Sequence, residues 1–232
     1  MADLIPLTHL LYLLLPLIAT GYLYYRWCGK RWELGYASIR MVGQLLLIGY
    51  TLVFLFGNDS TWVGICVLVT MILMSSIIAV RPFRKKSTFT HALLSVFTSG
   101  SVLLVLIIYG VLGERDLYVS KKVIPIAGML YSSAMNTLSI AGERYYSALE
   151  SGKSPLEARA EAFQTCMIPK VNTFLAVGLV SLPGMMTGQI LSGVSPLIAV
   201  RYQIMVMLML LGSGGLSAAM YLWLATRKTR QK

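Results

Sequence analysis

Residues 61–80 have the sequence TWVGICVLVTMILMSSIIAV, in which no side chain is charged. An α-helix crosses the hydrocarbon core of a bilayer with about 20 such residues, because its backbone polar groups all pair within the segment. The stretch therefore predicts a transmembrane helix. The whole chain is similar: 56% of its 232 residues are hydrophobic and 12% are charged, against about 25% charged in a typical soluble domain. This composition excludes an ordinary water-soluble enzyme and a disordered chain.

Six further stretches are apolar over a comparable length. The sequence thus predicts an all-α polytopic membrane protein, a single permease domain over residues 1–232 with seven transmembrane helices. The first stretch is expected to be a retained span, since Met1-Ala2-Asp3 lacks the basic start of a signal peptide. The seven predicted spans are Leu4–Tyr25, Ser38–Phe56, Thr61–Val80, His91–Leu112, Val123–Ala141, Val171–Leu191 and Pro196–Ala225.

The basic residues predict the orientation, because cytoplasmic segments of membrane proteins carry most of the Lys and Arg. With the N-terminus outside, 15 of the 20 basic residues fall in cytoplasmic segments and only Arg115, Lys121 and Lys122 fall outside. We therefore predict an N-out, C-in topology. The net charge of +11 is explained by this topology and by attraction to anionic lipids, so no nucleic-acid partner is expected.

Residues able to perform chemistry of their own are scarce at membrane depth. All nine acidic residues and both histidines lie near span ends or in loops, and the three cysteines are scattered. We expect no catalytic residue, metal cluster or disulfide. Gly152-Lys153-Ser154 matches the end of a P-loop, but Ser147 replaces its first glycine and no strand precedes it. The chain is thus expected to be no enzyme and to bind no cofactor, so any ATP would be hydrolysed by another subunit.

A loop of about 30 residues, 142–170, separates the fifth and sixth spans on the cytoplasmic side. It predicts a short helix over Glu143–Glu150 that stops at Gly152. Ser154-Pro155-Leu156-Glu157 then matches a capping box that starts a second helix, which Pro169 is expected to end. Leu156, Ala160, Phe163 and Met167 form one apolar face of that second helix.

Two interpretations of this amphipathic helix stay open. It lies on the membrane surface, or it docks as a coupling helix in a groove of a soluble partner. In the second case Ser154, Pro155, Leu156, Glu157, Phe163 and Met167 would couple the chain to that partner.

Polar side chains inside the spans are candidates for a translocation path. Ser132, Asn136 and Ser139 form a stripe on the fifth span, which equally suits hydrogen bonding between helices. Arg40 suits snorkelling to the interface, whereas Arg201 is a charge on the outer side that suggests function. The candidates for the path are Ser132, Ser133, Asn136, Thr187, Gln189, Arg201, Gln203, Arg40 and Gln44.

The sixth span contains helix-breaking residues. Pro183 removes a backbone hydrogen bond and Gly184 weakens the next turn, while Gly184 and Gly188 form a GxxxG pair that permits close approach of another helix. Either a packing kink or a hinge beside the translocation path fits this pattern. The small residues over 212–219 indicate another close-packed surface, within the chain or between two copies. The 13 methionines are interpreted as filling gaps in the core.

Several of these segments resemble the FetB-type family of ABC-transporter membrane subunits. The matching blocks are Ile124–Met129 with Met135-Asn136, Val177–Gln189, Tyr202–Met207, and Arg40, Gln44 and Gly49-Tyr50 in the second span. The resemblance extends from Ser38 to Leu224. Membrane subunits of a plant aluminium-tolerance ABC transporter are related to this family.

The resemblance implies a homodimer of this chain with two ATPase subunits that bind ATP-Mg. Together they would export iron from the cytoplasm across the inner (plasma) membrane. Two alternatives remain: a stand-alone passive channel or carrier for a small solute, and a non-transport scaffold or receptor.

Overall fold

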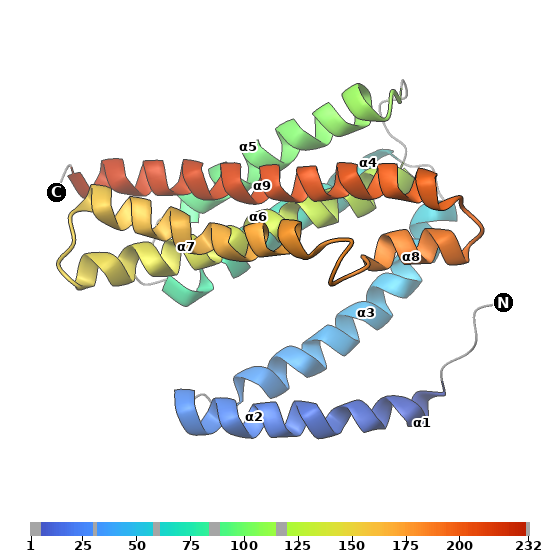
Figure 1. The fold of residues 1–232 in the computed structure, drawn as a ribbon, viewed down its shortest axis with the longest axis horizontal. Helices are drawn as coiled ribbons and strands as arrows, with labels where there is room; N and C mark the ends of the chain where they lie inside the picture. The colour runs from blue at the N-terminus through green and yellow to red at the C-terminus, as the bar shows by residue number, and fades with distance from the viewer. Residues whose placement is uncertain (1–5, 30–31, 58–60, 84–88, 115–119, 231–232) are drawn as a thin grey trace. The chain divides into compact units, whose positions relative to one another are not determined.

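Figure 1 shows the fold of the chain in a computed structural model, which describes residues 6–29, 32–57, 61–83, 89–114 and 120–230. The chain forms two compact units, Met1–Asp59 and Ser60–Lys232. Every regular secondary-structure element among the described residues is a helix, and one isolated β-bridge pairs Val177 with Ser181. The all-α class is therefore confirmed.

The first unit contains the first two predicted spans. α2 ends at Gly29, whose φ of 69° is the left-handed conformation that suits a helix C-terminus. The Tyr24 hydroxyl donates a 2.9 Å hydrogen bond to the Glu33 carboxylate at the start of the next helix. The elements of this unit are α1 (Leu7–Leu10), η1 (Leu11–Leu13), α2 (Leu14–Cys28) and α3 (Glu33–Gly57).

The second unit contains four described helical segments that are long and apolar enough to cross a membrane: Trp62–Ala79, Phe89–Val111, Lys122–Glu150 and Pro196–Thr229. They correspond to the third, fourth, fifth and seventh predicted spans. The other spans and the orientation stay predictions. The elements are α4 (Thr61–Ala79), η2 (Arg81–Phe83), α5 (Phe89–Val105), η3 (Leu106–Val111, wound as a π-helix), α6 (Ser120–Glu150), α7 (Pro155–Ala176), α8 (Gly184–Leu191) and α9 (Pro196–Arg230).

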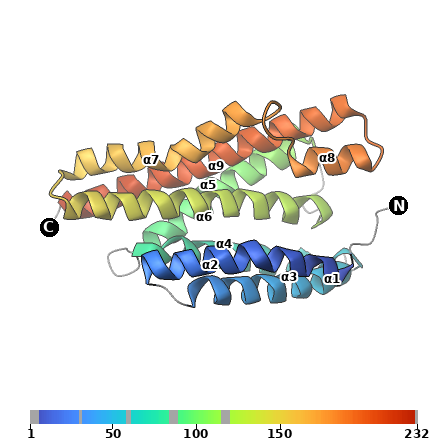
Figure 2. The ribbon, with the colours of Figure 1, turned by 60° about the horizontal axis from the view of Figure 1, so that its bottom comes forward.

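Helix α6 is at the centre of this unit. It packs against α4, α5, α7 and α9, and Figures 1 and 2 show α6, α7 and α9 side by side along much of their lengths. Its buried residues recur every three or four positions, as one face of a helix requires. They include Ala127, Leu130, Tyr131, Ala134, Leu138, Ala141 and Tyr145.

Glycines allow aromatic rings to approach the bundle closely. A Cβ atom at Gly142 would lie 2.2 Å from the ring of Phe83, and one at Gly100 would lie 2.3 Å from the ring of Tyr131. Real Cβ atoms do not tolerate such distances, so each ring occupies the space that a missing side chain leaves.

The predicted break between the fifth span and a short helix over Glu143–Glu150 is wrong. Residues 120–150 form one continuous helix, α6. With about 1.5 Å rise per residue, its 31 residues exceed the roughly 30 Å hydrocarbon thickness by about half. Gly142 does not interrupt the helix, and the Phe83 ring packs over it.

Two expectations for the following segment are also wrong. α7 continues past Pro169 to Ala176 instead of ending at that proline. The sixth predicted span, Val171–Leu191, is not one helix: it is divided between the end of α7, an irregular segment and α8. Pro169 is accommodated as prolines often are in membrane helices, and the Thr173 hydroxyl donates a 2.7 Å hydrogen bond to its carbonyl.

The irregular segment, residues 177–183, breaks the predicted span, and whether the break is a hinge beside a translocation path stays a prediction. Gly178 has a φ of 84°, and its N–H donates to the Ser181 carbonyl at 3.0 Å. The Ala176 carbonyl accepts hydrogen bonds from the N–H groups of Val180 (2.8 Å) and Ser181 (3.2 Å), which closes the end of α7. Pro183 has no N–H and extended backbone angles, so the chain restarts as α8 one residue later.

Candidate functional site

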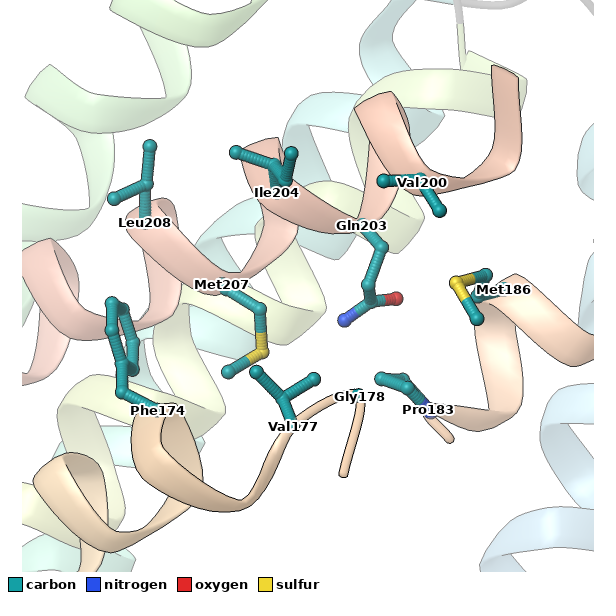
Figure 3. Close-up of a pocket in the computed structure, with 10 residues that line it drawn as sticks. All are labelled: Phe174, Val177, Gly178, Pro183, Met186, Val200, Gln203, Ile204, Met207 and Leu208. Carbon is teal, nitrogen blue, oxygen red and sulfur yellow. The ribbon is translucent and has the colours of Figure 1, made fainter. Parts of the chain in front are cut away.

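The break in the sixth predicted span forms one wall of a pocket of about 340 Å³. Figure 3 shows the side chain of Gln203 extending from α9 toward Gly178 and Pro183. Gln203 is buried, and its Oε1 has no hydrogen-bond partner among the described residues. A buried amide oxygen without a partner costs free energy. The pocket is otherwise apolar, lined also by Phe174, Val177, Met186, Val200, Ile204, Met207 and Leu208.

A second pocket, of about 230 Å³, lies between α6, α8 and α9. Gln189 of α8 lines it and also has a buried Oε1 with no partner in the described part of the chain. At one end the Lys122 ammonium donates to the Glu114 carboxylate. The remaining lining residues are Leu112, Pro125, Ile126, Met129, Met185, Tyr202, Met205 and Val206.

A lysine lies where the three long helices meet. Lys170 of α7 donates a hydrogen bond of 2.6 Å to the hydroxyl of Ser133 in α6, and that hydroxyl donates one of 2.6 Å to the Leu210 carbonyl in α9. A Cβ at Gly214 would lie 3.0 Å from Lys170 Cε, so the missing side chain makes room for the lysine. Sequence reasoning placed Lys170 at the end of a cytoplasmic loop; the structure instead places it against the middle of α6 and α9.

No member of the polar stripe on the fifth span is buried: Ser132 and Asn136 are exposed and Ser139 is partly buried. Ser132 donates to the Met129 carbonyl of its own helix. Beside the stripe, Ser133 is buried and makes the hydrogen bond between helices described above. Whether the stripe itself lines a path stays a prediction.

The small residues of α9 pack within this chain. The Ser213 hydroxyl donates to the Leu130 carbonyl at 2.8 Å, and the Ser217 hydroxyl donates to the Ala134 carbonyl at 3.3 Å. Gly214 faces Thr137 and Ser133. This part of the predicted close-packed surface thus joins α9 to α6.

The GxxxG pair makes no such contact. Cβ atoms built at Gly184 and Gly188 meet no atom within 4 Å among the described residues, so the approach of another helix at this pair stays a prediction. Thr187 donates to the carbonyls of Pro183 (3.2 Å) and Gly184 (3.0 Å), which stabilises the first turn of α8. Arg201 is exposed.

Two candidates belong to the other compact unit. Arg40 is partly buried and Gln44 is exposed, both on α3. Their proposed part in a path stays a prediction.

The turn between α6 and α7 has the geometry that its sequence predicts. Gly152, with a φ of 83°, donates to the Leu149 carbonyl at 3.0 Å, and Lys153 N–H donates to the Ala148 carbonyl at 3.2 Å. This pair of bonds is a Schellman motif. Ser154 and Glu157 then form the predicted capping box at the start of α7, with Pro155 at its first position.

Ionic contacts connect the two helices at this turn. The Glu161 carboxylate accepts hydrogen bonds from Lys153 in the turn and from Arg144 on α6. These hydrogen bonds, that from Lys153 first, lower the pKa of Glu161 below its ordinary value. The side-chain hydrogen bond from Ser154 likewise lowers the pKa of Glu157. The turn is therefore a defined structure, which we call the α6–α7 tip (residues 144–161).

The predicted apolar face of α7 is not the face that packs into the bundle. Ala158, Ala162 and Cys166 are buried, and the centre of this face, at Ala162, lies about 100° around the helix from Phe163. Leu156 is 44% exposed and Phe163 is 37% exposed, whereas Met167 turns toward Gly215 of α9 and is partly buried. Small side chains thus attach α7 to the bundle and leave an apolar edge uncovered.

A groove of about 510 Å³ runs beside this edge. Phe163 forms one wall, and Trp223 of α9, 43% exposed, forms the other. The Arg227 guanidinium lies 3.7 Å from the centre of the Trp223 ring, and Arg159 is at the groove as well. The rim is therefore basic. Ala160, Gln164, Ala219 and Leu222 complete the lining.

The sequence alone did not indicate Lys170 or the pocket residues Met129, Met185 and Met205 as members of a site. The described residues contain no group of three His, Cys, Asp or Glu side chains that could hold a metal ion. For the contact of Lys170 with α6 and α9, the sequence offered one signal: the run of small residues around Gly214, which indicated where another helix approaches.

The long apolar helices packed around α6 define a multi-pass helical membrane protein. The chain belongs to the family described as uncharacterised protein family UPF0014, whose profile matches residues 6–229. The family resemblance inferred from the sequence blocks is thereby confirmed.

Relatives cover most of this chain. The Probable iron export permease protein FetB of Escherichia coli is 34% identical over 218 residues, which are 85% of this chain and 80% of that protein. The UPF0014 membrane protein slr1647 of Synechocystis is 35% identical over 203 residues (80% and 78%). The UPF0014 membrane protein STAR2 of rice is 29% identical over 214 residues (84% and 73%). No solved structure matches the chain.

Proposed function

We propose that this chain is the membrane-spanning permease subunit of an ATP-driven exporter, whose ATP-Mg is hydrolysed by a separate ATPase subunit. The α6–α7 tip and its groove would form the docking surface for that ATPase on the cytoplasmic side. The observation that carries the proposal is the uncovered Phe163 edge on a helix that is attached by Ala158, Ala162 and Cys166.

The form of the tip supports force transmission. A helix that couples two proteins must be stiff, and this one has a capping box, a Schellman turn and the Glu161 ion pairs. Its C-terminal end runs directly into the broken segment at Gly178. Displacement of the tip would thus reach the pocket around Gln203 along one rigid helix.

The charge of the groove indicates the chemistry of the partner. Arg159 and Arg227 flank an apolar floor of Phe163 and Trp223. The complementary surface would present an apolar side chain surrounded by carboxylates. Two copies of this chain would each dock one ATPase, in the plasma membrane, as the family resemblance implies.

We further propose that the cargo is a metal ion. The Escherichia coli relative is named as a probable iron export permease, which supports iron. The alternative function is a stand-alone passive carrier for a small solute. It is favoured by the pocket at the helix break, which would need no partner to open.

Co-purification with a candidate ABC ATPase subunit, co-expressed with this chain, tests the docking proposal. Phe163→Ala should reduce association and ATP turnover while membrane insertion is unchanged. Ile168→Ala is the matched control, since Ile168 is an exposed apolar residue of the same helix outside the groove. Equal loss in both variants, or none in Phe163→Ala, would contradict docking at the groove. Solute flux in liposomes that hold this chain alone would favour the passive carrier.

A further inference from the structure

We propose that the pocket between α6, α8 and α9 binds a soft monovalent cation, of the class of Cu(I) or Ag(I), through the thioethers of Met129, Met185 and Met205. The amide oxygen of Gln189 would complete the site. The inference goes beyond the proposed function, because it concerns what this chain binds with no ATPase present.

The fold places three methionines that are distant in sequence in the lining of one pocket. Met129 comes from α6, Met185 from α8 and Met205 from α9, and all three line one pocket of about 230 Å³. Met185 and Gln189 are four residues apart on α8, so both lie on the same face of that helix. Thioethers are soft ligands that select Cu(I) among the biological first-row metals.

The amide of Gln189 is a second, independent indication of a ligand. Its Oε1 is buried and accepts no hydrogen bond from the described residues. A buried acceptor normally has a partner, and a bound cation would supply one. Gap-filling explains methionines in a core, but it does not explain an unpartnered amide oxygen beside them.

The charge of the pocket favours a monovalent ion. Glu114, the one carboxylate among the described lining residues, is paired with Lys122. The thioethers and the amide are neutral, so the ligand set carries no net charge to balance a divalent ion. A hard divalent ion also prefers carboxylate and water oxygens over sulfur.

None of the proposed ligands carries a proton to lose. Binding would therefore release no protons, and affinity would be nearly constant between about pH 5.5 and 7.5, unlike a cysteine or histidine site. This behaviour separates the pocket from adventitious binding at Cys28 and Cys66, which are exposed.

Titration of the purified full-length chain in nanodiscs with Ag⁺, in chloride-free buffer, tests the site. Methionine labelled with ¹³C in its methyl group reports each residue separately by NMR. The methyl signals of Met129, Met185 and Met205 should shift together at one equivalent of Ag⁺. Met185→Leu or Met205→Leu should weaken binding by about tenfold or more.

Met209→Leu is the matched control, since Met209 is a buried methionine of α9 that does not line the pocket. It should leave the titration unchanged. The proposal is overturned if the three methyl signals do not move together, or if Met209→Leu weakens binding as much as Met205→Leu. Because no ATPase is present, failure here leaves docking at Phe163 untouched, and failure of docking leaves this titration untouched.

Discussion

Lys170 Nζ lies 2.6 Å from Ser133 Oγ, and the described residues hold no ion pair that involves this lysine. Lys170 is half-buried, and a charge that is partly removed from water without a carboxylate partner is costly to keep. We expect Lys170→Met, which preserves the length of the side chain, to leave the unfolding temperature unchanged or to raise it. Lys170→Ala should lower it, because that substitution leaves a cavity. Thermal unfolding in detergent measures both, and a clear fall for Lys170→Met would show that the charge stabilises the fold.

The same lysine should oppose cation binding nearby. Ser133, which Lys170 contacts, is one turn of α6 from Met129. A like charge about 10 Å away costs on the order of 1–2 kcal/mol at an effective dielectric constant of about 20. We therefore expect Lys170→Met to tighten Ag⁺ binding by roughly tenfold. Lys153→Met, at the remote tip, is the comparison. Equal changes in the two variants would attribute the effect to net charge alone.

A part of this structure could be predicted from the sequence where the sequence pattern acts within a single helix or turn. The uncharged run over 61–80 and the Ser154–Glu157 box act within one helix or one turn, and both predictions are confirmed. Pro183 acts on its own backbone, and the chain is indeed broken just before it. Tertiary contacts overrode other local signals. Helix α6 is continuous where the Phe83 ring packs over Gly142, and α7 continues as a helix through Pro169.

The candidate sites depend on contacts between distant residues, which a single sequence does not contain. Lys170 meets Ser133 across 37 positions, and the methionines of the small pocket come from three helices. The apolar pattern of α7 was visible in the sequence, but which face of the helix packs into the bundle was not. Only packing shows that the alanine face is buried and the Phe163 face is exposed.

The contact between Phe83 and Gly142 predicts a destabilised variant. Gly142→Ala would place a Cβ 2.2 Å from the ring, and overpacking of this kind costs about 1–3 kcal/mol. A smaller residue at position 83 should recover part of that loss. We expect Phe83→Leu and Gly142→Ala to be non-additive in thermal unfolding. Additive effects would mean that the ring moves away without cost.

The α6–α7 tip should respond to acid. The folded pKa of Glu161 is lowered by Lys153 and Arg144, so its contacts stabilise the tip above the unfolded pKa of about 4.3 and are lost as the pH falls through the lower folded value. We expect amide protection over residues 144–161, corrected for intrinsic exchange, to decrease in that acidic range. Glu161→Gln should weaken this dependence and leave the part that Glu157 contributes, whereas Glu143→Gln, at an exposed carboxyl of α6, should retain it in full. If the unmodified protein and both variants had the same pH profile, Glu161 would not be the cause of the acid response.

The broken segment allows a comparison of two glycines six residues apart. Gly178 has a φ of 84°, which costs a residue with a Cβ about 1–2 kcal/mol, whereas Gly184 has helical geometry and open space around it. Gly178→Ala should therefore lower the unfolding temperature. Gly184→Ala should change the free energy of unfolding by less than about 0.5 kcal/mol.

If the segment only links two helices, a stable variant such as Gly184→Leu should also transport normally. If it is the hinge of a translocation path, Gly184→Leu and Pro183→Ala should reduce ATP-driven metal export in proteoliposomes more than they reduce assembly with the ATPase. Equal loss of export and assembly would assign the break to packing, since a hinge is needed for movement but not for association.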